Sequence, residues 1–330
     1  WGIDRSALGF VLSMELVGMA FGSIGFGRIA DRFGRRATIL TCLVIMSAGM
    51  FGAATAKGLF SLSAWRVFTG LGLGGMLAAT NAATAEIANT RKRAFCVVLM
   101  AGGYPIGNII GGSISAWILT QYTWHAIFIF GGCLALMFIP LVWMIVPESI
   151  SFLTASGAAE SLARVNAVLV RLRQSPINKL LARPVERTGI GALFSAQHLS
   201  QTVLLTMAYF AHFVTFYFIL KWIPKIVVDM GFEPSMAAGV LVSASVGGAL
   251  GCATIGLLSL KLRVGLLTVG TMVLSTVAVI FFGFSNSSLA HLSTIAAAAG
   301  FFTNAGVVGL YAIVAQTFPT KLRATATGLV

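Results

Sequence analysis

Two charged residues interrupt apolar stretches of this sequence and could do chemistry there. Arg66 begins the glycine-rich segment 66–75, and Glu15 lies well inside another apolar segment. A charge at membrane depth is costly and is usually functional. Arg66 could contact an anionic ligand or a proton-carrying acid, and Glu15 could be a proton carrier. The alternatives are an arginine that reaches the outer membrane surface and a structural glutamate that faces water.

A second set of residues could hold an organic ring. Tyr209, His212 and Tyr217 share one aromatic-rich apolar segment, and Asn304 and Tyr311 are seven positions apart, which places both on one helix face. Aromatic surfaces with a few polar groups suit a planar organic ligand. Aromatic residues at helical spacing also pack together in cores, and a lone histidine often makes a structural hydrogen bond, so this alternative stays open.

The segment 27–36 combines glycine, acid and arginine in the order GRIADRFGRR. Gly27 would allow another helix to approach closely, and Gly34 would allow a tight turn. Asp31 could accept hydrogen bonds from the N-terminus of a neighbouring helix. The order of these residues favours a specific loop structure over a loop that is merely basic. The basic side chains of the segment are Arg28, Arg32, Arg35 and Arg36.

Glycines at helical spacing occur in two segments. In 66–75 they lie within an apolar run with no flanking strand, which favours helix packing over a dinucleotide-binding loop. In 103–112 they are spaced by four, which places them on one face and predicts close packing there. This second segment could instead act as a hinge or contact a ligand, but packing is the preferred interpretation.

The elements that position these residues are membrane helices. Of the 330 residues, 58% are hydrophobic and 9% are charged, and the mean hydropathy is +0.93, which excludes a water-soluble globule. The polar interval 147–196 carries an amphipathic helix at about 158–174 and divides the chain. A further membrane helix, the tenth, is predicted to begin near Ala324. Nine full apolar stretches are long enough to cross a bilayer: 7–30, 37–56, 59–85, 94–120, 124–146, 199–222, 236–258, 264–285 and 289–316.

The basic residues give the orientation. One side of the predicted helices holds 17 of the 22 Lys and Arg residues, and Arg66 lies within a helix. Because positively charged loops stay cytoplasmic, residue 1 is predicted to be periplasmic and the interval 147–196 cytoplasmic. The net charge of +13 therefore reflects membrane topology rather than a nucleic-acid partner. Four basic residues lie on the opposite side: Arg5, Lys57, Lys221 and Lys225.

The two halves of the chain are related by an internal repeat. When the sequence is aligned with itself at an offset of 230 positions, several residues match, and the offset one position shorter matches Gly27 with Gly256. Two related halves are usual among secondary transporters that close alternately around a central site. The repeat predicts twelve helices in all, so we expect a fragment with the second to the tenth helices and the start of the eleventh. The main offset of 230 positions matches Gly70 with Gly300, Thr90 with Thr320 and Arg93 with Arg323.

These motifs resemble those of a known family. The segment 27–36 resembles the loop motif of the major facilitator superfamily, in which a charge network holds the cytoplasmic gate shut. By position, that gate maps onto Gly27, Asp31, Arg32, Gly34, Arg35, Arg36 and Glu86. Over essentially the whole chain, further motifs are similar to the aromatic acid:proton symporter family: segment 66–75, Glu86, Pro147-Glu148-Ser149, Trp222-Ile223-Pro224, segment 300–306 and segment 318–325.

The family resemblance implies proton-coupled uptake of aromatic carboxylates, such as hydroxybenzoates, across a bacterial inner membrane by alternating access. An acidic motif in the first helix is important in that family, and we expect that helix to precede this chain. The alternatives are a carrier of aliphatic acids, sugars or drugs, and a transporter-like sensor that does not translocate its ligand. An enzyme is not expected, because the sequence has no nucleophile or metal-ligand constellation.

The expected fold is therefore all-α, a polytopic membrane protein of the major facilitator type with two pseudosymmetric helix bundles. The N-terminal bundle spans 1–146, the cytoplasmic linker 147–196 and the C-terminal bundle 197–330. The expected partners are a small organic anion, protons and the lipid bilayer. The protein is expected to act as a monomer without a cofactor, and the four cysteines show no metal-ligand spacing.

Overall fold

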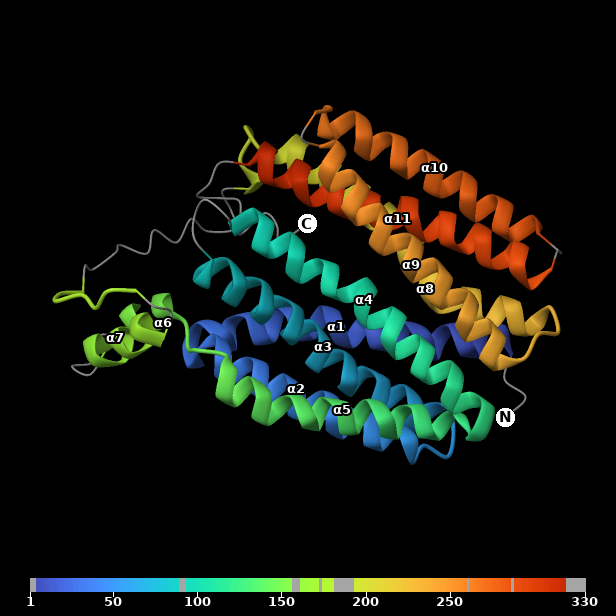
Figure 1. The fold of residues 1–330 in the computed structure, drawn as a ribbon, viewed down its shortest axis with the longest axis horizontal. Helices are drawn as coiled ribbons and strands as arrows, with labels where there is room; N and C mark the ends of the chain where they lie inside the picture. Colours follow the sequence, from blue (N-terminus) through green and yellow to red (C-terminus); the bar gives the residue numbers. More distant parts are fainter. Residues whose placement is uncertain are drawn as a thin grey trace. The chain divides into compact units, whose positions relative to one another are not determined.

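The computed structural model is a set of α-helices (Figure 1). It describes residues 4–88, 93–155, 161–171, 174–180, 193–259, 261–285 and 288–318. The chain divides into two compact units. Unit 1 comprises Trp1–Met100 and Tyr122–Val185, and unit 2 comprises Ala101–Gln121 and Glu186–Val330. The predicted bundle boundaries at 146 and 197 stay a prediction.

The long helices follow the apolar stretches of the sequence. One of them, α4 (Arg93–Gln121), begins in unit 1 and continues from Ala101 in unit 2. Unit 1 otherwise holds α1 (Arg5–Phe33), α2 (Arg35–Ala54), α3 (Leu59–Ile87), α5 (Trp124–Ile145) and the short helices α6 (Ile150–Ala155) and α7 (Ser161–Arg171). Unit 2 holds α8 (Leu199–Asp229), α9 (Pro234–Leu258), α10 (Val264–Phe284) and α11 (Leu289–Thr317).

All nine predicted membrane helices are present among the described residues. Seven of the long helices are apolar enough to cross a membrane by length and composition, namely those in α1, α2, α5, α8, α9, α10 and α11. The other two, α3 and α4, have 29 residues each, but both are rich in glycine, serine and threonine, which lower the mean hydropathy. The tenth helix predicted near Ala324 lies outside the described residues.

In unit 1, α1 and α3 touch along a seam of glycines. A Cβ atom at Gly18 would lie 2.2 Å from a carbonyl oxygen of α3. A Cβ atom at Gly70 would lie 2.2 Å from the carbonyl oxygen of Glu15, and one at Gly74 would lie 2.0 Å from another carbonyl oxygen of α1. No side chain fits into such spaces, so only glycine allows this approach. The packing predicted for the 66–75 glycines is confirmed.

In unit 2, α9 and α11 form the same seam. A Cβ atom at Gly247 would lie 1.9 Å from a carbonyl oxygen of α11, and one at Gly300 would lie 1.9 Å from the carbonyl oxygen of Ala244. Gly247 corresponds to Gly18 and Gly300 to Gly70 at the two offsets of the internal repeat. The repeat therefore exists as the same helix contact, made by corresponding residues, in each unit.

Two other glycine predictions are wrong for the part of the chain that the structure describes. A Cβ atom at Gly27 would meet no atom within 4 Å, and the same is true of Gly103, Gly107 and Gly111. Glycine spacing shows which residues share a helix face, but it does not show whether another helix lies against that face. The face of α4 is therefore not closely packed at these glycines.

Helix α8 is longer than the sequence indicated. The predicted end was residue 222, but the helix continues through Pro224 to Asp229. Proline disfavours a helix interior because it lacks the backbone N–H donor. Ile219, Ile223 and Val227 lie on one face of α8 and are buried in a core that α9, α10 and α11 share. Burial of this face outweighs the effect of the proline.

The polar interval after α5 is partly helical. The predicted amphipathic helix at 158–174 is present as the shorter α7, whose Val165 is fully buried. The sequence did not predict α6, which follows Pro147, Glu148 and Ser149. This short helix positions Glu148 and Ser149 beside the end of α1 and the start of α2 in unit 1.

Candidate functional site

Glu15 of α1 and Arg66 of α3 form a buried ion pair in unit 1. The Glu15 Oε2 and Arg66 Nη2 atoms are 2.5 Å apart, and the two side chains are only 11% and 16% exposed. The glycine seam positions the pair, because Gly70 lies directly against the backbone of Glu15. Each charge would be costly if it were buried alone, so each offsets the desolvation of the other.

This geometry brings together two residues that the sequence singled out separately. The Arg66 guanidinium lies against the proposed proton carrier and is largely buried. The Arg66 guanidinium binds the Glu15 carboxylate directly, so a second carboxylate could compete with Glu15 for the guanidinium. The roles of both residues in transport stay predictions.

A second set of polar residues in unit 1, called here the charge cluster, consists of Arg35, Arg36, Glu86, Glu148 and Ser149. Arg35 Nη2 lies 3.2 Å from Glu86 Oε1. The Ser149 hydroxyl donates a hydrogen bond to the other oxygen of the Glu86 carboxylate. These contacts connect the C-terminal end of α3 to the N-terminal end of α2 and to the segment after α5.

Glu148 caps α2. Its Oε1 atom accepts hydrogen bonds from the backbone N–H groups of Arg35 at 2.8 Å, Arg36 at 3.2 Å and Ser149 at 2.9 Å. The first N–H groups of a helix have no partner within the helix and attract negative charge. Gly34, with φ of 99°, makes the turn before α2, which confirms the predicted turn. A Cβ atom there would lie 2.5 Å from Glu148 Oε2, so the carboxylate needs a glycine at this position.

The gate residues predicted from the family resemblance are partly assembled. Arg35 and Glu86 are paired. Arg36 lies over the ring of Trp143, with its Cζ atom 5.1 Å from the ring centre, and Arg32 lies similarly over Phe33. The Asp31 side chain lies outside the described residues. Glu148 was not among the site residues predicted from the sequence. Its segment Pro147-Glu148-Ser149 was part of the family resemblance, and this was the signal that could have identified it.

His212 belongs to a chain of hydrogen bonds in unit 2. Its Nε2 atom donates to the carbonyl oxygen of Thr303, 2.8 Å away. The Thr303 hydroxyl donates to the carbonyl oxygen of Ala299 and accepts from the Ser275 hydroxyl at 2.6 Å. His212 is buried and packs against Gly306, where a Cβ atom would clash with its ring. These contacts link α8, α10 and α11.

The predicted aromatic residues form a layer beside the hydrogen bonds of His212. Tyr209 is buried, its ring centre lies 5.9 Å from that of Tyr311, and its hydroxyl has no hydrogen-bond partner among the described residues. Tyr217 contacts the rings of Phe213 and Phe216. Within the part of the chain that the structure describes, the layer is therefore mostly apolar, and the Tyr209 hydroxyl is buried in it without a hydrogen-bond partner.

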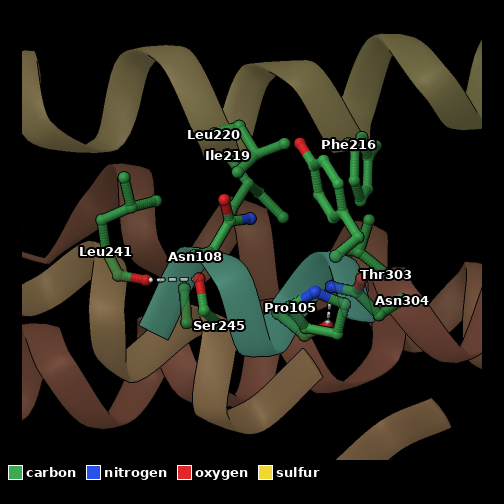
Figure 2. A pocket seen from close by; sticks show the side chains of 12 residues that line it. Pro105, Asn108, Phe216, Ile219, Leu220, Leu241, Ser245, Thr303 and Asn304 are labelled. Atoms are coloured by element: carbon green, nitrogen blue, oxygen red, sulfur yellow. Dashed lines mark hydrogen bonds between the residues drawn. The ribbon is translucent and has the colours of Figure 1, made fainter. Parts of the chain in front are cut away.

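A small pocket lies in unit 2 beside these residues (Figure 2). The cavity has a volume of about 20 Å³, which fits one water molecule but no aromatic ring. Among the predicted site residues, Asn304 lines this pocket, while Tyr209, His212, Tyr217 and Tyr311 do not. The side chains or backbones of twelve residues line it: Tyr104, Pro105, Asn108, Phe216, Ile219, Leu220, Leu241, Ala244, Ser245, Gly300, Thr303 and Asn304.

Sequence reasoning missed most of this lining. It treated Tyr104, Pro105 and Asn108 as part of a packing or hinge motif. It included Phe216 only within the aromatic-rich segment and did not single out Ser245. The available signal was Asn108, a carboxamide near the middle of a predicted membrane helix. A polar side chain in such a helix usually has a specific partner.

The pocket and the ion pair occupy corresponding places in the repeat. Ala244 and Gly300 line the pocket, and they correspond to Glu15 and Gly70 at the repeat offsets. Arg66 corresponds to Ala296, a buried residue of α11. The α1–α3 seam of unit 1 thus carries a buried ion pair, whereas the corresponding α9–α11 seam of unit 2 carries small apolar side chains next to a pocket.

The family model described as Major Facilitator Superfamily matches residues 1–330. The chain belongs to the major facilitator superfamily. This major facilitator is 30% identical to a 4-hydroxybenzoate transporter of Acinetobacter baylyi, over 98% of this chain and 73% of the relative. It is 29% identical to a gallate transporter of Pseudomonas putida, over 98% of this chain and 73% of the relative.

Solved structures give the same fold. The xylose transporter of Escherichia coli, in its inward-open conformation, superimposes with a TM-score of 0.70 at 18% identity, over 99% of this chain and 77% of the transporter. The major facilitator is a multi-pass membrane transporter and not an enzyme. Its expected all-α fold and its resemblance to aromatic acid transporters are both confirmed.

Proposed function

We propose that this protein takes up aromatic carboxylates of the hydroxybenzoate type together with protons by alternating access. The buried Glu15–Arg66 ion pair carries the proposal, because it places a proton acceptor and an anion-binding group in direct contact. The similarity to transporters named for 4-hydroxybenzoate and gallate supports the choice of substrate class.

The ion pair gives a simple coupling scheme. When the substrate carboxylate binds Arg66, it displaces the Glu15 carboxylate, and a proton enters the site with the substrate and binds Glu15. The loaded site holds Arg66⁺, the anion and neutral Glu15, so its net charge equals that of the empty site. An equal net charge lets both forms change conformation without moving an unpaired charge through the membrane.

The remaining residues have supporting roles in this proposal. Asn304 lines the pocket of unit 2, and the neighbouring residues Tyr209, His212, Tyr217 and Tyr311 support the binding of the ring beside it. The charge cluster acts as a gate on the cytoplasmic side, where rearrangement of its ion pairs accompanies the switch between conformations. The protein works as a monomer in a bacterial inner membrane, with residue 1 periplasmic and the interval 147–196 cytoplasmic.

The test is uptake of labelled 4-hydroxybenzoate by proteoliposomes that contain the full-length protein. We expect accumulation driven by an inward proton gradient and abolished by a protonophore. Arg66→Ala should lower both accumulation and substrate exchange by roughly a hundredfold, because a buried anion loses its counter-ion. Glu15→Gln should retain exchange, which needs no net proton movement, and lose gradient-driven accumulation.

Two controls separate loss of function from loss of folding. The double variant Glu15→Gln with Arg66→Ala leaves no unpaired buried charge, so it should be stable but inactive. Lys57→Ala removes an exposed charge between α2 and α3 and should behave like the wild type. Unchanged uptake by Arg66→Ala would eliminate the proposed scheme, and exchange of neutral sugars in place of aromatic acids would eliminate the substrate class.

A further inference from the structure

The polar groups around the pocket of unit 2 differ in whether they already have partners. Ser245 donates a hydrogen bond to the carbonyl oxygen of Leu241 at 3.0 Å, and the Nδ2 atom of Asn304 donates to the carbonyl oxygen of Gly300 at 3.0 Å. The Thr303 hydroxyl donates to the carbonyl oxygen of α11 one turn earlier. These donors are therefore engaged within their own helices.

Asn108 is different. Its carboxamide makes no hydrogen bond with any residue that the structure describes. Figure 2 shows this carboxamide turned from α4 toward the side chains of Ile219 and Leu220. A carboxamide offers two N–H donors and one acceptor oxygen, and leaving them unpaired against apolar side chains is unfavourable. The position suits a polar group that arrives with a ligand.

The lining also determines which polar group fits. None of the twelve lining residues carries a charge, so the pocket offers no counter-ion for a carboxylate. A neutral hydroxyl group can donate to the Asn108 oxygen and accept from its N–H groups. The side chains of Phe216 and Pro105 provide apolar surfaces for a ring that carries such a group.

We propose that Asn108 is a specificity-determining residue that hydrogen-bonds a hydroxyl substituent on the ring of the transported acid, while the carboxylate of that acid lies outside this pocket. This inference rests on the proposed function. It requires the pocket to widen on binding, because its present space holds about one water molecule. On the same segment of α4, a Cβ atom at Gly103, Gly107 or Gly111 would meet no described atom within 4 Å, which leaves space at these three positions.

The experiment compares uptake of labelled 4-hydroxybenzoate and labelled benzoate by the full-length protein, as a ratio of the two kcat/KM values. Asn108→Leu keeps the branched shape of the asparagine side chain and its number of non-hydrogen atoms, but the leucine side chain is bulkier and cannot form hydrogen bonds. We expect it to lower the preference for the hydroxylated acid at least about tenfold and to leave benzoate uptake within about threefold of the wild type. Retained benzoate uptake shows that the variant is folded.

The matched control is Ser245→Ala, which lines the same pocket but loses a hydroxyl that is already bonded to its own helix. It should leave the preference ratio unchanged. If Asn108→Leu lowers uptake of both acids equally, or changes neither, Asn108 does not determine specificity and the inference is wrong. A well-folded wild-type protein that transports neither acid would instead refute the proposed function, and this inference with it.

Discussion

Individual side chains in this transporter show how buried charge is stabilised. Glu15 and Arg66 stabilise each other directly, at a distance of 2.5 Å. Glu148 has a different partner, since its carboxylate accepts hydrogen bonds from three backbone N–H groups at the start of α2 and after α5. Such bonds combine a charged acceptor with the positive end of a helix, which makes them stronger than neutral ones.

Replacement of Glu148 should destabilise the protein. Glu148→Ala leaves the N–H groups of Arg35 and Arg36 without their acceptor, and the expected loss is about 1–2 kcal/mol. Glu148→Gln keeps an acceptor oxygen but loses its charge, so it should cost less, about 0.3–1 kcal/mol. Thermal unfolding of the purified protein in detergent would measure both.

Glu233 provides the comparison, because it stands at the N-cap of α9 without a cap hydrogen bond from its side chain. Glu233→Ala should change stability by less than about 0.5 kcal/mol. Equal losses for Glu148→Ala and Glu233→Ala would show that the Glu148 cap contributes nothing specific.

Pairs of helices in the two units are held by the same device. The α1–α3 seam and the α9–α11 seam use glycines at corresponding positions, Gly18 with Gly247 and Gly70 with Gly300. Close contact of the two backbones fixes the rotation of each helix, which then places the neighbouring side chains. The ion pair in unit 1 and the pocket lining in unit 2 both depend on this contact.

Alanine in the seams should therefore be destabilising in both units. Gly18→Ala and Gly247→Ala would each place a Cβ atom within 2.2 Å of a carbonyl oxygen, so the helices must separate. Overpacking of this kind costs about 1–3 kcal/mol, and we expect similar losses of thermal stability at the two positions.

Gly103→Ala is the matched test in a helix without a seam. Among the described residues, no atom lies within 4 Å of its Cβ position, and alanine favours helix over glycine by about 1 kcal/mol, so stability should stay equal or rise. A loss at Gly103 as large as at Gly18 would contradict the distinction between packed and open glycines.

At the scale of the whole molecule, the distribution of basic residues makes a prediction about orientation. Lys57 lies between α2 and α3, and Lys261 lies between α9 and α10; both are exposed. The charge asymmetry puts Lys57 on the periplasmic side and Lys261 on the cytoplasmic side. The seven apolar helices show that the protein crosses the membrane repeatedly, but they are equally compatible with either direction.

Cysteine labelling would decide the direction. Lys57→Cys and Lys261→Cys would be introduced separately after replacement of Cys42, Cys96, Cys133 and Cys252 by serine or alanine. In intact cells, a membrane-impermeant maleimide should label Lys57→Cys and leave Lys261→Cys unlabelled until the membrane is permeabilised. The reverse pattern would show that the orientation is inverted.

The sequence alone determined the nine membrane helices of the described residues and the repeat, because membrane spans are continuous apolar stretches and each satisfies its own backbone hydrogen bonds. It also identified Glu15 and Arg66, since a charge is conspicuous in an apolar segment. In these cases the information is local, or is repeated at a fixed offset.

Only the tertiary structure decided which of these residues meet. It paired Arg66 with Glu15, brought Glu148 to the start of α2 and placed Asn108 in a pocket with residues of α8, α9 and α11. It also separated the packed glycines of α3 from the open ones of α4, although both sets have helical spacing. The physical reason is that spacing fixes a face of a helix, whereas the contacts of that face depend on how residues distant in the chain pack against it.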